Sequence, residues 1–454
     1  GYLCFHCLMP TDNDTIVAMA TPPGTGGVGV VRISGGDTER IARVMLGSLP
    51  EPRVATYVSF VNSRGESLDQ GLALYFPGPA SFTGESVVEL HGHGGPVVMS
   101  SLVDAAVELG ARLAEPGEFS KRAFLNDKLD LAQAEAIADL IGSGTAQAAR
   151  AALRSLNGIF SAAVNELVEQ LTALRIYVEA AIDFPEEEID FLADDELAER
   201  LAACAASFET LLARAAGGRV MRDGYQVVIV GKPNAGKSSL MNRLSGEETA
   251  IVTEIAGTTR DVLRERINID GLAVELVDTA GLRDDPDRIE EEGIRRARKA
   301  MAEADAVLWI QDATEPVPER IEEPVPDGVA VTIVRNKIDL SGGQPGIVEG
   351  DSPVVLLSAR TGAGLDALRK RIRDLAGFRD LGEGAFTARR RHVEALREAQ
   401  KHFEAGREAL QAARAGELLA EELRLSQQAL ATITGEFTPD DLLGRIFSEF
   451  CIGK

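Results

Sequence analysis

The stretch Gly231-Lys-Pro-Asn-Ala-Gly-Lys-Ser238 decides the fold of this chain. It fits the phosphate-binding pattern G-x-x-x-x-G-K-[S/T], which requires a strand before it and a helix after it. The apolar run Tyr225–Val230 precedes the pattern and predicts a buried strand, and Leu240–Leu244 follows it with helical character. The stretch therefore predicts a phosphate-binding loop at the end of a strand in an α/β domain.

The chemistry of this loop follows from its charges. Backbone N–H groups of the turn and of the helix N-terminus point at a bound anion. We expect Lys237 to reach the outer phosphates and the Ser238 hydroxyl to bind Mg²⁺. The residues of this stretch that we expect to line the nucleotide are Asn234, Ala235, Gly236, Lys237, Ser238 and Ser239.

Two further motifs carry the phosphate and Mg²⁺ chemistry. A threonine of Gly257-Thr-Thr-Arg-Asp261 can complete the Mg²⁺ coordination and sense the γ-phosphate. The strand-like run Val274–Asp278 continues into Thr279-Ala-Gly281. We expect Asp278 to hold Mg²⁺ through water and the Gly281 N–H to contact the γ-phosphate.

The last two motifs select the base. Asn336-Lys-Ile-Asp339 follows a predicted strand, and the Asp339 carboxylate can accept hydrogen bonds from the N1–H and the 2-amino group of guanine. Adenine lacks this donor pair, so the motif predicts GTP rather than ATP. Ser358-Ala-Arg360 supplies backbone contacts near the base. Together the motifs predict a GTP-binding domain whose ligand lies at the carboxyl ends of the strands.

The catalytic group is less obvious. Ras-type GTPases place a glutamine directly after the D-x-x-G turn to orient the attacking water. Here Leu282 stands in that place and cannot hydrogen-bond water. Asn234 could ligate a monovalent cation where an arginine finger would reach, and Glu290 could act on the water. From spacing alone, however, Glu290 is better interpreted as an exposed residue at a helix N-terminus.

Composition bounds the class of protein. The chain has 454 residues, which predicts about three domains at roughly 150 residues each. With 47 Lys and Arg against 71 Asp and Glu the net charge is −24, which opposes extensive unassisted contact with RNA. If RNA is a substrate, a basic partner or a small local patch must hold it. We interpret Arg295–Lys299 and Arg389–Arg391 as solvated helix faces or partner contacts rather than main RNA sites.

Cysteine usage predicts a reducing, cytoplasmic location. The cysteines are Cys4, Cys7, Cys204 and Cys451. They are too few and too scattered for a disulfide framework. The pair Cys4-x-x-Cys7 has no second pair to complete a zinc site, so we reject that interpretation. Residues Gly1–Leu8 look foreign to the rest, and we interpret them as a cloning remnant or a misplaced start.

Two patterns near the N-terminus invite other functions. Gly24–Gly29 matches the dinucleotide fingerprint G-x-G-x-x-G, which must open a helix. Pro22-Pro23 precedes it and a strand pattern follows, so we predict a loop and no NAD site. His91-Gly-His93 has no third ligand in view, and we predict a packed turn rather than a metal site.

Periodicity divides the chain into regions of different predicted secondary structure. An α+β region extends from Asp14 to about Asp130, a helical region follows, strands alternate with helices from Gly224 to about Gly377, and long helices return. The economical explanation is a helical domain with an α/β domain inserted in it. Predicted strands are Thr15–Ala20, Val28–Ile33 and Ser86–Leu90; predicted helices are Val97–Leu109, Ala132–Ile141, Ala146–Leu156, Phe160–Ile182, Asp195–Ala215, Glu383–Ala415 and Leu418–Ile433.

Taken together, these stretches resemble the bacterial MnmE family of tRNA-modification GTPases, also called TrmE. The resemblance runs from Asp14 to Lys454. Besides the GTP motifs, it is carried by Asp14–Ala18, Thr21–Gly24, Arg32–Gly35, Phe82–Glu85, Glu89–Gly95, Pro116–Asp130 and Phe450–Lys454. The resemblance implies a tetrahydrofolate-binding and dimerisation domain at residues 9–128. It also implies a helical domain at 129–222 and 379–454, with a Ras-like, potassium-activated GTPase domain inserted at 223–378.

The resemblance also assigns residues to ligands. It implies Ser238 and Thr259 for Mg²⁺, and Glu290 as the catalytic glutamate. The implied K⁺ ligands are Asn234, Thr253, Ile255 and Thr258. For a one-carbon folate, either 5-formyl- or 5,10-methylene-tetrahydrofolate, the implied contacts are Arg32, Glu89, Lys128 and Lys454. The remaining implied GTP contacts are Thr253, Glu254, Ile255, Ala256, Gly257, Thr258, Thr259, Asp278, Thr279, Ala280, Gly281, Asn336, Lys337, Asp339, Ser358, Ala359 and Arg360.

The family's reaction needs a partner. The resemblance implies a homodimer that works with the FAD-containing protein MnmG to add an aminomethyl or carboxymethylaminomethyl group at C5 of the wobble uridine of certain tRNAs. Cys451 is a nucleophile or lines the site; Gly453 and Lys454 do not fit a prenylation box. An alternative function is a nucleotide-switched GTPase of ribosome assembly, against which the acidic charge counts.

Overall fold

The computed structural model describes most of the chain as two compact units. The described residues are 14–183, 195–232, 234–247, 264–270, 272–278, 302, 304–316, 325, 329–350, 353–377, 385–436, 440–448, 450 and 452–453. One unit contains residues 1–138 together with 431–454, and the other contains residues 139–430. Both ends of the chain therefore belong to the first unit.

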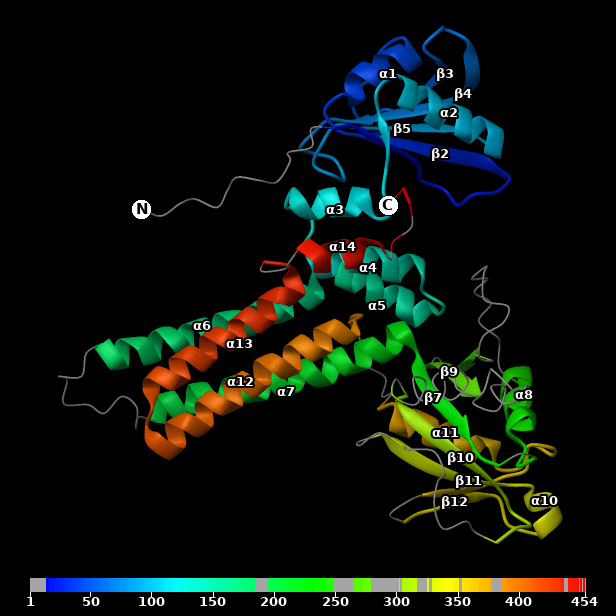
Figure 1. Ribbon diagram of the computed structural model, residues 1–454, viewed down its shortest axis with the longest axis vertical. Coiled ribbons are helices and arrows are strands. Elements are labelled where there is room, and N and C mark those ends of the chain that lie inside the picture. The colour runs from blue at the N-terminus through cyan, green and yellow to red at the C-terminus, as the bar shows by residue number, and fades with distance from the viewer. Residues whose placement is uncertain are drawn as a thin grey trace, which may run out of the picture. The chain divides into compact units, whose positions relative to one another are not determined.

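The first unit is built on a six-stranded sheet with the order β3-β4-β5-β2-β1-β6 (Figure 1). Its strands are β1 (Ile16–Met19), β2 (Gly26–Ser34), β3 (Thr56–Val61), β4 (Ser67–Phe76), β5 (Val87–Gly94) and β6 (Arg112–Leu113). Every neighbouring pair is antiparallel except β1 and β6. Ile41 and Met45 of α1 (Thr38–Leu46) and Leu102 of α2 (Pro96–Glu108) pack against Val31 and Ile33 to form the core.

The C-terminal residues complete a second cluster of the first unit. Phe447 of α14 (Asp440–Ser448) and Phe450 pack with Leu131, at the start of α4 (Leu131–Ile141), and with Phe124 of α3 (Glu118–Leu125). The Phe447 ring lies 5.3 Å from that of Phe450 and 6.4 Å from that of Phe124. The end of the chain is thus part of the N-terminal unit.

In the second unit, long helices that precede residue 224 pack with long helices that follow residue 389 (Figure 1). They are α5 (Ala146–Leu156), α6 (Ile159–Asp183), α7 (Asp195–Asp223), α12 (Arg390–Ala413) and α13 (Gly416–Thr434). Phe208 of α7 lies 5.4 Å from Phe403 of α12, and Arg175 of α6 donates to Gln427 of α13 at 2.6 Å. Helices far apart in sequence therefore share one hydrophobic core.

The second unit also holds a seven-stranded sheet with the order β12-β13-β11-β10-β7-β9-β8. Its strands are β7 (Tyr225–Val230), β8 (Arg264–Ile269), β9 (Leu272–Asp278), β10 (Ala306–Asp312), β11 (Ala330–Asn336), β12 (Gly346–Val348) and β13 (Val354–Leu356). The inner strands are parallel, while β12 and β8 run antiparallel at the edges. A mostly parallel sheet of this kind fits the α/β domain that the sequence predicted.

Both faces of that sheet are buried, which explains the continuous apolar runs of its strands. Val227 and Ile229 face the side covered by α8 (Lys237–Glu247) and α11 (Leu365–Leu375). Val228 and Val230 face the opposite side, where they pack with Val277 and Val307.

Several boundaries differ from those that periodicity predicted. Helix α7 continues to Asp223 and ends where Gly224 takes a left-handed conformation with φ of 82°. Helix α12 begins at Arg390, and residues 385–389 before it are non-helical. The Arg389 N–H donates to Nδ1 of His392 and so caps the start of the helix.

Two interpretations of short patterns near the N-terminus are corrected. The Gly24–Gly29 pattern is not a loop throughout, because β2 begins at Gly26 and pairs with Gly94 of β5. His91 and His93 lie on β5 rather than in a turn. Both patterns therefore belong to the sheet. No helix in the described part of the chain is long and apolar enough to span a membrane.

Candidate functional site

The phosphate-loop pattern lies where the strand order of the second sheet reverses. Strand β7 leads into the loop, and its two neighbours, β10 and β9, come later in the chain on opposite sides. In such sheets this position is the usual ligand crevice. Close backbone approach requires both glycines of the loop: a Cβ on Gly231 would lie 2.3 Å from the Ile310 oxygen, and one on Gly236 would lie 2.2 Å from Asn336 Nδ2.

The side chains of the loop are arranged for an anion. Lys237 is only 6% exposed, and its Nζ donates to the carbonyl oxygens of Gly231 at 2.6 Å and Lys232 at 2.8 Å. The ammonium group is thus held over the loop. Ser238 is exposed in the first turn of α8, and Asn234 is exposed with a left-handed φ of 63°.

Asp278 ends β9 at the same edge of the sheet. Its register partner is Ile229 of β7, one residue before that strand ends. An aspartate therefore ends the strand next to β7, and the phosphate loop leads from β7 to Ser238 in the first turn of α8. Carboxylate and hydroxyl oxygens are hard donors that suit Mg²⁺, so the residue types fit the expected ion.

Asn336 joins three loops on the base side of the site. It is 2% exposed, and its Nδ2 donates to the Ala235 oxygen of the phosphate loop at 3.0 Å. Its Oδ1 accepts from the Lys337 N–H at 2.8 Å and the Ala359 N–H at 2.9 Å. One buried amide thus connects the phosphate loop, the N-K-x-D turn and the Ser358-Ala-Arg360 turn.

Lys337 adopts a left-handed conformation and pairs with the strand beside it. Its φ is 67°, and its Nζ lies 2.7 Å from Asp312 Oδ2, at the end of β10. The hydrogen bond from Lys337, with further bonds from Thr314, lowers the pKa of Asp312 to about 2. Asp312 is therefore ionised at neutral pH and holds the Lys337 ammonium group in place.

Asp339 lies in the short helix α10 (Ile338–Ser341) with both carboxylate oxygens engaged. Ser358 Oγ donates to Oδ1 at 2.7 Å, and Arg360 Nη2 lies 3.2 Å from Oδ2. The Arg360 side chain is 77% exposed, whereas the Asp339 side chain is 14% exposed. The structure thus brings together the predicted base-reading carboxylate and the predicted turn at Ser358.

Part of the predicted site lies outside the described residues. This applies to Thr253, Glu254, Ile255, Ala256, Gly257, Thr258, Thr259, Thr279, Ala280, Gly281, Glu290, Cys451 and Lys454. Their assignments to GTP, K⁺, Mg²⁺, catalysis and folate remain predictions.

Two predicted folate residues meet in the first unit. Arg32 of β2 and Glu89 of β5 are register partners, and Arg32 Nε and Nη2 lie 2.8 Å and 2.7 Å from Glu89 Oε1. The second Glu89 oxygen lies 3.2 Å from His91 Nε2. An ion pair across two strands therefore orients the arginine.

Two aromatic rings lie near the arginine of this pair. The Arg32 guanidinium carbon lies 5.6 Å from the ring centres of both Phe82 and Phe119, within cation–π range. Arg32 Nη1 also lies 3.5 Å from the Gly453 oxygen. Lys128, the third described folate residue, instead donates to the Pro79 oxygen at 3.1 Å.

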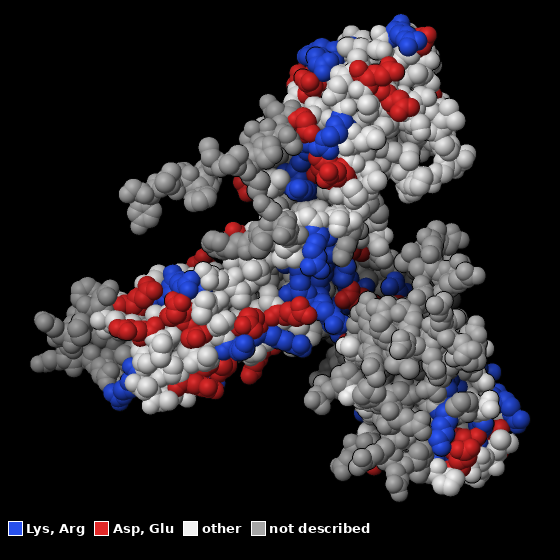
Figure 2. All heavy atoms as spheres, in the orientation of Figure 1, with Lys and Arg blue, Asp and Glu red and all other residues white. Residues whose placement is uncertain are grey.

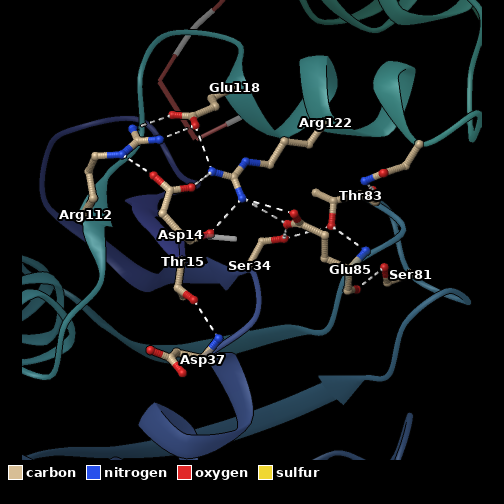
Figure 3. A network of polar contacts seen from close by, with 11 residues as sticks. Asp14, Thr15, Ser34, Asp37, Ser81, Thr83, Glu85, Arg112, Glu118 and Arg122 are labelled. Atoms are coloured by element: carbon tan, nitrogen blue, oxygen red, sulfur yellow. Dashed lines mark hydrogen bonds and ion pairs between the residues drawn. The ribbon is translucent and has the colours of Figure 1, made fainter. Parts of the chain in front are cut away.

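A charged network holds the loop that carries Phe82 (Figure 3). Arg122 lies at its centre and donates to Asp14 Oδ1 at 2.6 Å, Glu118 Oε1 at 3.0 Å and Glu85 Oε1 at 3.1 Å. Glu85 in turn accepts from Ser34 Oγ at 2.7 Å, two residues after Arg32 on β2. The network therefore ties the loop to the strand that bears Arg32.

Ionisation of the carboxylates sustains this network. Burial alone would raise the pKa of Glu118, but hydrogen bonds from Arg112, the Glu115 N–H and Arg122 outweigh it and lower the pKa. The same balance holds for Asp14, where bonds from Arg112 and Arg122 lower the pKa against burial.

Sequence reasoning missed the residues that surround Arg32. Phe82 and Phe119 lie in stretches that carry the family resemblance, but their types alone gave no sign that they face an arginine. The strand pairing of Arg32 with Glu89 was equally hidden, because register is not visible in the two strand patterns.

Within the described residues, no group of three His, Cys, Asp or Glu side chains could hold a metal ion.

Comparison with protein families covers nearly the whole chain. A model of the MnmE helical domain matches residues 131–451. A second model, described as the N-terminus of the GTP-binding protein TrmE, matches residues 15–128.

Two solved structures are similar to shorter parts of the chain. The G domain of the Thermotoga maritima FeoB iron transporter is 22% identical; the match covers 34% of this chain and 98% of that one, with a TM-score of 0.24. A GTP-binding protein from the archaeon Sulfolobus solfataricus, in complex with GDP, is 19% identical over 47% of this chain and 67% of that one, also with a TM-score of 0.24.

Proposed function

The chain belongs to the MnmE (TrmE) family of tRNA-modification GTPases, and we propose that it is a potassium-activated enzyme that modifies C5 of the wobble uridine. In this proposal GTP hydrolysis drives conformational steps of tRNA modification. The FAD-containing partner MnmG and a tetrahydrofolate one-carbon donor complete the reaction, which yields an aminomethyl or carboxymethylaminomethyl group. We further propose that the enzyme is a cytoplasmic homodimer joined through its N-terminal domain.

The observation that carries the proposal for the nucleotide is the joint at Asn336. Its amide bonds both the phosphate loop and the turn after β13, so the phosphate and base halves of the site are fixed relative to each other. Asp339 faces the same turn through Ser358. On guanine binding, its carboxylate accepts from the base and exchanges its contact with the exposed Arg360 side chain for the ligand.

The residues around the phosphates have separate roles in this proposal. Lys237 donates to the outer phosphate oxygens, and the Ser238 hydroxyl, with Thr259 and water held by Asp278, binds Mg²⁺. Asn234, Thr253, Ile255 and Thr258 supply oxygen atoms to K⁺, which neutralises charge that develops on the phosphates. Glu290 orients the attacking water, directly or through a second water, because Leu282 cannot.

The one-carbon donor is assigned to the aromatic-lined pair in the first unit. Arg32 and Glu89 present oriented donors and acceptors beside the ring of Phe82, which suits a flat, hydrogen-bonding heterocycle. Lys128 and Lys454 complete the proposed contacts. Cys451 is two residues before Gly453, whose oxygen lies 3.5 Å from Arg32, so the proposal assigns it to the same site.

The cation requirement gives a direct test of the GTPase part. We expect purified protein to hydrolyse GTP at least about tenfold faster in KCl than in NaCl at equal ionic strength, because K⁺ is the ion that we propose to neutralise the developing charge. Glu290→Ala should abolish this hydrolysis while GDP affinity stays within about twofold, and Glu291→Ala is the matched control. Equal rates in the two salts would refute potassium activation, and full turnover by Glu290→Ala would refute its catalytic role.

A further inference from the structure

A basic surface lies on the helical part of the second unit. Figure 2 shows Lys and Arg side chains gathered over α5 and the first turn of α12. Although 71 of the 454 residues are Asp or Glu, none occurs from Gly142 to Asn165 or from Ala385 to Val393. These two segments contain five arginines, and we call the four that are not buried the arginine patch: Arg150, Arg154, Arg390 and Arg391.

Buried contacts bring the two segments of the patch together. Ser155 Oγ donates to the Thr387 oxygen at 3.0 Å and accepts from the Thr387 N–H at 2.9 Å. Arg154 Nη1 donates to the Ala385 oxygen, 231 residues later in the chain, at 3.1 Å. The Phe160 and Phe386 rings stack with centres 4.7 Å apart. Helix α5 and the segment before α12 are therefore fixed side by side.

Beneath the patch, buried and half-buried arginines are compensated by aspartates. Arg389 and Arg222 both contact Asp139 Oδ1, at 2.8 Å and 2.7 Å, and Arg222 also pairs with Asp223. Arg150 and Arg390 are exposed, and among the described residues neither forms an ion pair with an acidic side chain. Arg150 and Arg390 are thus left to interact with solvent or with a ligand.

We propose that the arginine patch binds the phosphate backbone of tRNA. The inference rests on the proposed function, which makes tRNA the substrate of this enzyme. A chain with a net charge of −24 repels nucleic acid at long range, so contact requires a local site in which positive charge dominates. The patch meets this requirement: its four arginines stand against one exposed acidic residue in the next turn of α12, Glu394, and screening limits the influence of more distant carboxylates to about 8 Å at physiological salt. Arginine is also suited to phosphate, which it can bind through two parallel hydrogen bonds.

This surface changes the interpretation of Arg389–Arg391 as a solvated helix face or partner contact. In sequence the run is short and lies beside acidic residues from Glu394 onward. Only the fold adds Arg150 and Arg154, from a helix without any acidic residue. The patch contacts phosphates and not bases, so we expect it to position tRNA without reading its sequence.

The test is a salt titration of tRNA binding by the full-length protein. Fluorescently labelled tRNA is titrated with wild type, with Arg150→Ala/Arg390→Ala and with Arg407→Ala/Arg424→Ala. The control pair removes the same charge from positions engaged in ion pairs with Glu404 and Glu421. We expect the patch variant to bind about tenfold more weakly and its slope of log Kd against log salt to fall by about two, because each removed arginine neutralises one phosphate in wild type.

The outcomes separate this proposal from the proposed function. If patch and control variants share the affinity and slope of wild type, the patch does not bind tRNA, while the proposed function stands. If the patch variant keeps tRNA affinity but loses the flavoprotein partner, the patch is a protein interface and the proposal is wrong. If wild type binds no tRNA, the patch proposal fails as well. Wobble-uridine analysis in cells that produce wild type then decides the proposed function independently.

Discussion

At the scale of single residues, Asn336 has more structural connections than a base-contacting role requires. Its amide satisfies the Ala235 oxygen and the Ala359 N–H, both of which lie in loops that have no regular secondary structure of their own. A buried polar group left without its partner costs about 1–3 kcal/mol. The geometry of the site therefore depends on this one side chain.

Removing that amide should loosen both halves of the site. We expect Asn336→Ala to weaken GDP binding by about tenfold or more, which corresponds to about 1.4 kcal/mol. Titration with a fluorescent GDP analogue measures the effect, and circular dichroism shows whether the chain stays folded. Asn242→Ala, at an exposed position of α8, is the matched control. Unchanged affinity in Asn336→Ala would show that the loops hold their positions without it.

Asp339 should determine which base is bound. In Asp339→Asn the side-chain oxygen still accepts from N1–H, while the new amide donates to an oxygen at C2, so xanthine replaces guanine as the preferred base. Competition of XDP and GDP for the site measures the change. Arg360→Ala should leave the preference for guanine intact, since it removes only the side chain that pairs with Asp339. Retained guanine selectivity in Asp339→Asn would disprove the base-reading role.

At the scale of elements, the sequence predicted the helices and strands whose apolar residues recur with a regular period. Helix α5 was predicted with its observed bounds, and β1, β2, β5, α2, α4, α6 and α13 were predicted within a few residues, because apolar periodicity is a local property. Residues 385–389 were predicted as helix and are not. There, tertiary contacts with Ser155 and with Gly218, where a Cβ would lie 2.3 Å from the Phe386 oxygen, override the helical pattern.

The candidate site likewise has features that a contiguous motif predicts and features that it does not. The GTP motifs could be placed from sequence because each motif is contiguous and follows a strand. The Asn336 joint, the pairing of Arg32 with Glu89 and the rings of Phe82 and Phe119 could not, because each joins residues from separate elements. Their relation depends on register and loop packing, which no local pattern encodes.

The network around α3 should make the first unit sensitive to acid. The folded-state pKa of Glu118 is below its ordinary value of 4.5, so its ion pairs stabilise the fold above that pH, and the stabilisation is lost as pH falls through the lower value. We expect Glu118→Gln to lower the melting temperature at pH 7 by about 4 °C, from about 2 kcal/mol of lost hydrogen bonding.

The pH dependence of the melting temperature should distinguish wild type from Glu118→Gln. Between about pH 5 and pH 3 the melting temperature of wild type should fall more steeply than that of Glu118→Gln, which has one fewer carboxylate to protonate. Glu115→Gln, an exposed neighbour, should behave as wild type. Calorimetric scans across this range measure both slopes, and parallel curves for wild type and Glu118→Gln would contradict the ionic account of the network.

At the scale of the whole molecule, the chain combines a nucleotide-binding sheet, long helices drawn from both sides of it in sequence, and an N-terminal unit that includes the C-terminal residues. The predicted domain boundaries at residues 128, 222 and 378 remain predictions. We propose that the GTPase part supplies the driving force, and that tRNA modification depends on the unit that contains Arg32 and Gly453. The two activities must then fail together when nucleotide selection fails.

The most direct test is nucleoside mass spectrometry of tRNA from a bacterial strain that lacks its own enzyme of this family. Wild type should restore the aminomethyl or carboxymethylaminomethyl group at C5 of the wobble uridine, whereas Asp339→Asn, made in equal amount, should not. Restoration by Asp339→Asn would separate modification from GTP binding. Unmodified wobble uridines in the strain that produces wild type would contradict the proposed function itself and favour a role in ribosome assembly.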